Sequence, residues 1–357
     1  MTSSPLVLTV LLFASLTGLL VLAPRSSSPM TPAKEEEAVV VVGDGKGGGD
    51  GGEDDDLALL RRATLDAGEG AAMAMAPAGP KVAFMFLTNS DLTFAPLWER
   101  FFEGHGERIN VYVHADPAAE LRLPPTKSFR GRFVAARPTK RADATLIAAA
   151  RRLLAAALVD DAANAYFALL SQHCVPVHSF PRLYASLFPP QAAHHHRLPS
   201  YIEVLSGEPQ MQSRYAARGD DAMLPEVPFD RFRVGSQFFT LARRHAVLVV
   251  RERRLWRKFR QPCLNPDSCY PEEHYFPTLL DMADPAGVAR YTLTHVNWTG
   301  SVHGHPHKYT ADEVSAELVA DLRRSKNATY DYMFARKFSP ECLGPLMDIA
   351  DTVLFND

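Results

Sequence analysis

Short, nearly continuous apolar runs recur in the first half of the chain. KVAFMFLT (81–88), INVYVHAD (109–116) and AYFALLS (165–171) contain few polar residues, and GRFVAA (131–136) is a weaker run of the same kind. Strands that are apolar on both faces are typical of a parallel sheet covered by helices, whereas half-exposed strands alternate. The pattern therefore predicts four buried strands.

Apolar residues with helical spacing occur between these runs. APLWERFFEG (95–104) follows the first strand, and an alanine-rich helix is predicted over 140–163, just before the strand at 165–171. Farther along, residues 232–252 are predicted to pass from a strand into a helix, and residues 290–298 to form another strand. Alternating strands and helices predict an α/β fold with a mostly parallel central sheet.

The ends of the predicted strands indicate where a ligand would bind. In open α/β sheets, ligands bind beyond the carboxyl ends of the strands. We therefore expect a site near Thr88, Asp116 and Ser171. Later in the chain, Thr310 is followed three residues on by Glu313, a capping-box pattern that predicts a helix start.

The stretch CYPEEHYFPTLLDM (269–282) combines features that are unusual for a surface helix. Pro271 suits the first turn of a helix, and the helix dipole would stabilise the adjacent carboxylates of Glu272 and Glu273 there. Pro277 cannot donate to the carbonyl of Glu273, so we expect a kink that aims one glutamate into a cleft. Such a carboxylate could act as a general base, although an ordinary acidic helix start would have the same composition.

The N-terminal region predicts a route into the secretory pathway. After a tail at 1–5, residues 6–23 (Leu6–Ala23) are uncharged and mostly apolar, which fits an uncleaved signal anchor and, as the alternative, a cleaved signal peptide. Residues 24–79 are rich in Gly, Pro, Ser and acidic side chains, and are predicted to form a disordered stem. The folded body is expected at 80–357.

Charge argues against a nucleic-acid partner. The formal net charge is −3, and acidic residues concentrate at 34–69, which leaves the remainder slightly basic. That balance suits an anionic ligand but lies far from the strongly basic surface of a nucleic-acid-binding protein.

Cysteines and sequons agree with an oxidising lumen. The four cysteines allow two disulfides, and the alternative is buried thiols. N-glycosylation sequons start at Asn297 and Asn327. The disulfide candidates are Cys174, Cys263, Cys269 and Cys342.

Metal ligands and activated nucleophiles are not evident in the sequence. The acidic run Asp54–Asp56 falls in the predicted stem, and the strand end that reads LLSQHC carries no acidic pair. The histidines at 194–196 and at 303–307 suit loops better than a zinc site. We therefore expect no metal, and the charge of an anionic ligand would be neutralised by cationic side chains instead. The candidates are Lys308, Arg336 and Lys337.

Several segments together resemble a known family. KVAFMFLTNSDLTFAPLWERFFEG, VYVHADP, FALLSQHCVPVHSF, FRVGSQFFTLARRHA, CYPEEHYFPTLL, LTHVNW and FARKFSPECLGPL are similar, in this order, to the plant branch of the core-2/I-branching β-1,6-N-acetylglucosaminyltransferases. The resemblance spans residues 80 to about 355. It implies a metal-independent, inverting glycosyltransferase with a GT-A-type fold. It also implies a type II Golgi membrane anchor with a luminal catalytic domain, a UDP-sugar donor and a glycan acceptor.

The resemblance also implies roles for individual residues. Glu273 matches the family's general base, and Lys337 matches its basic contact to the donor phosphates. Lys308 is the candidate for a second phosphate contact, and Asp116 matches a position near the donor nucleoside. Glu203 and Arg214 are the acceptor candidates. The chain departs from the family pattern at Asn297, where relatives usually carry Asp, and in the loop around His194–His196.

These observations predict a Golgi glycosyltransferase that transfers N-acetylglucosamine or a related sugar. One alternative is a non-catalytic glycan-binding or scaffold protein on the same fold. A weaker one is a glycoside hydrolase that uses Glu272 and Glu273 as a pair. Adjacent residues in a helix point about 100° apart, which places two such carboxylates poorly around one bond.

Overall fold

The computed structural model describes residues 39–40, 51–66, 79–124, 126–189, 198–301, 304–325 and 329–357. All of them belong to one compact unit, Ala38–Asp357. The predicted anchor at Leu6–Ala23, the histidines 194–196 and the sequon at Asn327 lie outside the described residues. No helix in the described part of the chain is long and apolar enough to cross a bilayer.

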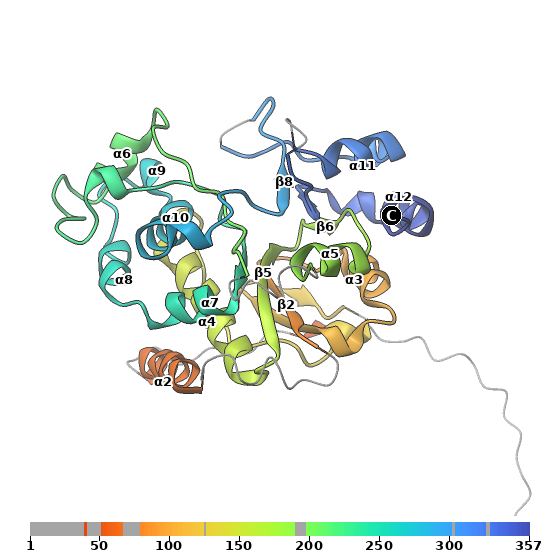
Figure 1. The fold of residues 1–357 in the computed structure, drawn as a ribbon, viewed down its shortest axis with the longest axis horizontal. Coiled ribbons are helices and arrows are strands. Elements are labelled where there is room, and N and C mark those ends of the chain that lie inside the picture. The colour runs from red at the N-terminus through yellow and green to blue at the C-terminus, as the bar shows by residue number, and fades with distance from the viewer. Residues whose placement is uncertain are drawn as a thin grey trace, which may run out of the picture. The chain divides into compact units, whose positions relative to one another are not determined.

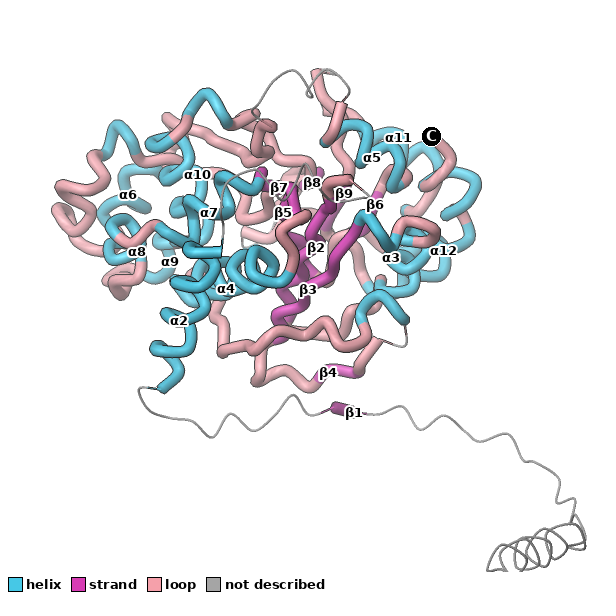
Figure 2. The backbone as a smooth tube through the Cα atoms, turned by 60° about the horizontal axis from the view of Figure 1, so that its bottom comes forward, coloured by secondary structure: helices cyan, strands magenta, loops and turns pink. Residues whose placement is uncertain are grey.

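The described strands form a central sheet, a smaller second sheet and one short pair (Figure 2). The central sheet has the order β3-β2-β5-β7, the second sheet has the order β6-β9-β8, and β1 pairs with β4. The strands are β1 (Val39–Val40), β2 (Lys81–Thr88), β3 (Ile109–Ala115), β4 (Leu121–Arg122), β5 (Asn164–Ser171), β6 (Val175–Pro176), β7 (Thr240–Ala242), β8 (Thr294–Val296) and β9 (Phe334–Arg336).

The central sheet is mostly parallel, as the apolar runs predicted. Strands β3, β2 and β5 run parallel, and β7 pairs with β5 in the antiparallel sense. In the register, Phe84 of β2 pairs with Val111 of β3 and with Ala168 of β5. The three strongest predicted strands are therefore confirmed.

The predicted strand at 131–136 is wrong, because this segment makes one isolated bridge, between Phe133 and Val113. Beyond it, the backbone donors bond to side chains. The N–H of Arg137 donates to His114 Nε2, and the N–H of Thr139 donates to Asp116. Side-chain acceptors at the end of β3 thus replace the ladder bonds of a fourth strand.

Helices cover both faces of the central sheet (Figures 1 and 2). Helices α4, α7 and α10 belong to the apolar cluster on one face, and α3, α5 and α12 belong to the cluster on the other. The helices are α2 (Gly51–Asp66), α3 (Ala95–Phe102), α4 (Ala144–Asp160), α5 (Phe180–Leu187), α6 (Met211–Ala216), α7 (Arg243–Arg251), α8 (Arg254–Phe259), α9 (Pro266–Cys269), α10 (Pro271–Ala283), α11 (Ala316–Arg323) and α12 (Leu343–Asp348).

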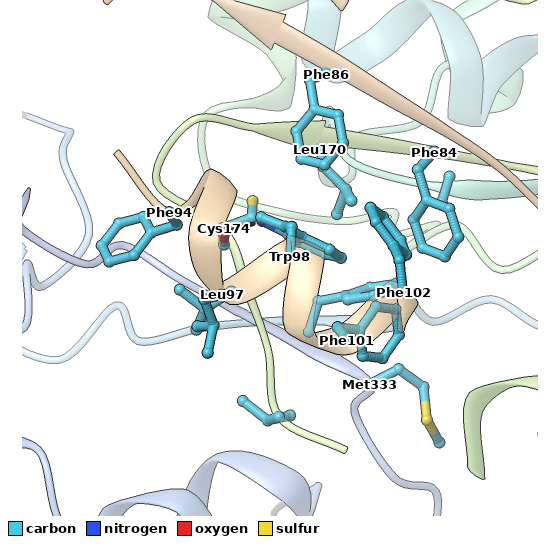
Figure 3. Packing of buried hydrophobic residues seen from close by; sticks show 14 of the residues in the cluster. Phe84, Phe86, Phe94, Leu97, Trp98, Phe101, Phe102, Leu170, Cys174 and Met333 are labelled. Atoms are coloured by element: carbon cyan, nitrogen blue, oxygen red, sulfur yellow. Dashed lines mark hydrogen bonds between the residues drawn. The ribbon is translucent and has the colours of Figure 1, made fainter. Parts of the chain in front are cut away.

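Alternate side chains of β2 enter two separate apolar clusters. Phe84 and Phe86 pack with the aromatic residues of α3, where the Phe86 and Trp98 ring centroids are 5.2 Å apart (Figure 3). Ala83 and Met85 belong to the cluster that contains α4. Because successive side chains of a strand point to opposite faces, one apolar strand organises both layers.

Helix α2 lies within the stem that was predicted to be disordered over 24–79, and it corrects that prediction for Gly51–Asp66. The helix packs against α4. Asp56 accepts from Arg152 Nε at 2.8 Å and lies 3.2 Å from Arg137 Nε. The composition of the segment suggested disorder, but arginines of the folded body neutralise its acidic face, and their positions cannot be read from the segment itself.

The capping box at Thr310 is present, but it begins a single 3-10 turn at Ala311–Glu313 instead of a long helix. Val314 is extended, with φ −69° and ψ 113°. Helix α11 then starts separately, where the Ser315 side chain accepts from the N–H of Leu318. The predicted helix is therefore divided in two.

Trp98 is expected to be a main contributor to stability. It is 2% exposed, and its indole N–H donates to the carbonyl of Cys174 at 3.2 Å. Replacing Trp98 by Ala should lower the free energy of unfolding by about 3–5 kcal/mol, because a large cavity is left in the core. Urea denaturation measures this loss. Phe229→Ala, at a position that is 43% exposed, should cost far less, and equal losses would contradict the packing described here.

Candidate active site

The start of helix α10 is shaped by a disulfide and a left-handed turn. Cys263 is bonded to Cys269, the last residue of α9. Tyr270 follows with φ +38° and ψ 57°, so that the chain turns sharply into α10. Pro271 lies in the first turn, as predicted, where a missing N–H has no consequence. The two glutamates follow directly.

Helix α10 continues through Pro277 to Ala283, but the proline changes the hydrogen-bond partner of one backbone carbonyl. Because proline has no N–H, the carbonyl of Glu273 lacks its partner inside the helix. This carbonyl accepts from the N–H of Gly235 at 2.9 Å. A Cβ atom at Gly235 would collide with the carbonyl oxygen of Glu203, so glycine permits the close approach. One backbone bond thereby joins α10 to the segment beside Glu203.

Glu273 lies with the two acceptor candidates. Its Oε2 accepts from Arg214 Nη1 at 2.5 Å, and its side chain is 31% exposed. Burial raises the pKa of Glu203, and the charge of Glu273 raises it further, while a backbone hydrogen bond from Ser236 opposes the shift. The structure therefore brings Glu203, Arg214 and Glu273 together.

The ring of Tyr270 links this group to a second one. The Arg214 guanidinium lies 4.9 Å from the ring centroid, and the Arg141 guanidinium lies 5.9 Å from it. A tyrosine ring attracts cations through the negative potential of its face. Tyr270 thus contacts both Arg214, the partner of Glu273, and Arg141, which belongs to a group of basic residues.

The basic residues predicted to contact the donor lie close enough to influence one another. Burial lowers the pKa of Lys337, and the charges of Arg336, Lys308 and Arg141 lower it further. Burial also lowers the pKa of Arg336, whose guanidinium lies 4.3 Å from the centroid of the Phe238 ring. We call Arg141, Lys308, Arg336 and Lys337 the cationic cluster. Concentrated positive charge of this kind suits an anionic ligand.

His173 connects the cationic cluster to the end of β5. Burial lowers its pKa to about 4, and the positive charge of Lys337 contributes. Its Nδ1 lies 3.1 Å from the carbonyl oxygen of Phe338, and the N–H of Tyr309 donates to the carbonyl of Lys337 at 2.8 Å. These contacts hold the segment around Lys337 beside the carboxyl edge of the central sheet.

Asp116, at the end of β3, holds the segment that carries Arg141. Its Oδ1 accepts from the N–H of Ala118 at 2.9 Å, and its Oδ2 accepts from both the N–H and the hydroxyl of Thr139 at 2.7 and 2.6 Å. Burial alone would raise the pKa of Asp116, but these hydrogen bonds outweigh it and lower the pKa. The carboxylate thus anchors Thr139 in this structure.

Glu272 is buried beside Glu273. It is 3% exposed, and its Oε1 accepts from the N–H of Ala142 at 3.0 Å. Burial raises the pKa of Glu272 to about 7, and the charge of Glu273 contributes. A buried side chain that is bonded to the backbone is badly placed to flank a glycosidic bond together with Glu273, which argues against the hydrolase alternative.

The remaining candidates are structural or peripheral. Cys174 and Cys342 are free, buried thiols rather than a second disulfide, and burial raises the pKa of each. Asn297 is half-buried, and its Oδ1 accepts from the N–H of Thr299 at 2.9 Å. Among the described residues, no three His, Cys, Asp or Glu side chains gather as they would around a metal ion.

Two hollows in the described part of the chain lie outside this group of residues. One of about 400 Å³ is lined by residues that include Met211 and Phe229, and it borders the helix that carries Arg214. The other, of about 510 Å³, is lined by residues that include Leu59 and Tyr112. Neither lining includes Glu273 or a member of the cationic cluster, so the site is recognised by its polar contacts.

Sequence reasoning missed three contributors to the site. Arg141 lies outside the segments that resemble the family, and His173 lies inside one of them but was given no role; the proximity of both to Lys337 depends on the tertiary fold. Gly235, in the sequence VGSQ, carried a weak signal, because a glycine among apolar residues can mark a close backbone approach.

Comparisons with known proteins agree with the earlier resemblance. Residues 82–323 match the family model of the Core-2/I-branching enzymes. The chain is also similar to Glycosyltransferase BC10 of Oryza sativa subsp. japonica, with 27% identity over 323 residues that cover 77% of this chain and 77% of that protein.

The buried carboxyl of Glu272 predicts a pH-dependent effect on stability. Its folded pKa of about 7 exceeds the ordinary value of 4.5, so its contribution is fully present below pH 4.5 and is lost as the pH rises through 7. Glu272→Gln removes that loss and should stabilise the protein at pH 8 by up to about 3 kcal/mol. Urea denaturation at pH 4.5, 6 and 8 measures it. If the difference in unfolding free energy between Glu272→Gln and the wild type did not change with pH, this result would contradict the burial of an ionisable carboxyl here.

Proposed function

Because the chain belongs to the Core-2/I-branching enzyme family, we propose that this glycosyltransferase moves N-acetylglucosamine or a related sugar from a UDP-sugar to a hydroxyl of a glycan or glycoprotein. Transfer inverts the configuration of the anomeric carbon. The proposal is carried by one observation: the Tyr270 ring contacts both Arg214, which binds the Glu273 carboxylate, and Arg141 of the cationic cluster.

Glu273 acts as the general base. It removes the proton of the acceptor hydroxyl as the oxygen attacks the anomeric carbon, and the carbon–oxygen bond to the diphosphate breaks on the opposite side. Arg214 holds the carboxylate in place through its 2.5 Å contact. A positioned base of this kind contributes about a hundred- to ten-thousand-fold in rate. Glu203 lies beside Glu273 and contacts the acceptor.

Arg336, Lys337 and Lys308 stabilise the departing diphosphate. Preorganised positive charge has a larger effect in a partly desolvated site than in water, because no solvent must reorganise as negative charge develops. The lowered pKa of Lys337 supports this role, since an anion would offset the repulsion from Arg336 and Lys308 that helps to lower it. The reaction then needs no metal ion. Asp116 lies near the donor nucleoside.

The setting of the reaction is the Golgi lumen. A single-pass type II orientation would place the catalytic domain there, with Leu6–Ala23 as the anchor. The bond between Cys263 and Cys269 supports an oxidising compartment, because disulfides persist in secretory proteins and are rare in the cytosol.

Replacing Glu273 by Gln tests the base. Turnover with the best donor from a screen of UDP-sugars should fall by about a hundred- to ten-thousand-fold, because the amide cannot take a proton. Donor binding should stay near its wild-type strength. Glu107→Gln is the matched control, at an exposed glutamate that precedes β3 at the opposite end of the sheet. Full activity of Glu273→Gln would refute the assignment.

Removal of metal ions tests the role of the cations. Initial rates of transfer should be unchanged after dialysis against excess chelator, because side chains neutralise the diphosphate. Lys337→Ala should lower the rate by about a hundredfold with or without chelator. A rate that collapses in chelator and returns with added Mn²⁺ or Mg²⁺ would show that a metal ion is required.

A further inference from the structure

The segment from Arg137 to Asp143 is fastened at both of its ends. Near its start, the Asp116 carboxylate binds the backbone and the hydroxyl of Thr139. At its end, Asp143 caps helix α4 by accepting from the N–H of Thr145 at 2.9 Å. We call residues 137–143 the connecting segment.

Between these points, Ala142 is held in a conformation that it does not favour by itself. Its φ is +58°, in the left-handed region that alanine rarely adopts. The N–H of Ala142 donates to Glu272 Oε1 at 3.0 Å. This bond is therefore a contact that stabilises the unusual turn, and it joins the connecting segment to the first turn of α10.

The residue just before this turn is Arg141, a member of the cationic cluster, and it contacts the segment that precedes Lys308. Its Nη2 donates to the carbonyl of Gly304 at 3.1 Å, and its Nη1 lies 2.9 Å from His305 Nε2. Its charge is close enough to Lys337 to lower the pKa of that lysine. Arg141 is exposed, so its guanidinium can donate to a ligand from solvent.

We propose that Arg141 is a further ligand of the donor diphosphate, and that Glu272 is the positioning residue that places it by holding the N–H of Ala142. The inference rests on the proposed function, because it assumes a nucleoside diphosphate in the cationic cluster. It gives Glu272, the neighbour of the proposed base Glu273, a role of its own.

The surroundings of Glu272 support a specific role for that contact. Its Oε2 is buried and has no hydrogen-bond partner among the described residues. A carboxyl in this environment is costly to bury, and the neighbouring Glu273 adds repulsion. A smaller apolar side chain would avoid both costs but would leave the N–H of Ala142 without its acceptor.

Binding of UDP to the full chain, measured by titration calorimetry, tests the proposal without knowledge of the acceptor. Arg141→Ala should weaken UDP about tenfold, the effect of losing one charge-assisted hydrogen bond, with an unchanged melting temperature. Glu272→Ala should weaken UDP by a similar factor. Glu272→Gln should bind UDP like the wild type, because the amide oxygen still accepts from Ala142.

The double variant shows whether Glu272 acts through Arg141. If it does, Arg141→Ala with Glu272→Ala should bind UDP no more weakly than Arg141→Ala alone. If the double variant lost UDP affinity by the product of the two single-variant losses, the inference would be overturned. An Arg141→Ala protein that binds UDP normally would also overturn it. Should Glu272→Ala fold poorly, the exposed Arg141→Ala and the isosteric Glu272→Gln still decide. A wild-type protein that does not bind UDP would instead refute the proposed donor class, and this inference with it.

Discussion

Burial of strand β2 on both faces is the constraint on which the rest of the structure depends. Its alternate side chains enter two apolar clusters, so helices must cover the sheet on both sides. The parallel neighbours β3 and β5 then bring their carboxyl ends to the same edge as β2. At that edge, Asp116 fastens the connecting segment and His173 contacts the segment around Lys337. The positions of the polar groups thus follow from the packing of an apolar strand.

Glu273, the candidate base, is joined to the rest of the protein by a hydrogen bond of its own backbone. The carbonyl of Glu273, which Pro277 leaves without a helical partner, is bound by Gly235, whose lack of a side chain admits the segment beside Glu203. A backbone bond does not depend on the charge of the side chain. The Glu273 carboxylate can therefore gain or lose a proton while the start of α10 stays in place.

Much of the fold could be predicted because strong periodicity is local. The strand at 81–88 and the helix start at Pro271 needed no knowledge of distant residues. The segment at 131–136 makes only one bridge to β3, because just beyond it the N–H groups of Arg137 and Thr139 donate to side chains at the end of β3. In the site, Glu273 was marked by a local motif, whereas the position of Arg141 depends on contacts with residues far away in the sequence. Tertiary contacts of this kind leave no pattern near the residue itself.

Helix α2 has a consequence for where the catalytic unit begins. A chain cut at Pro80 would lose Asp56 and leave the buried guanidinium of Arg152 without that carboxylate. In the intact protein, α2 and the surface of α4 on which it packs are parts of one chain, so their association is intramolecular. Covalent linkage can give two contacting surfaces an effective concentration on the order of millimolar. The contact between α2 and the folded body would then be formed most of the time, even if it were too weak to hold a separate α2 peptide. The fraction of molecules with α2 docked would not change as the protein is diluted.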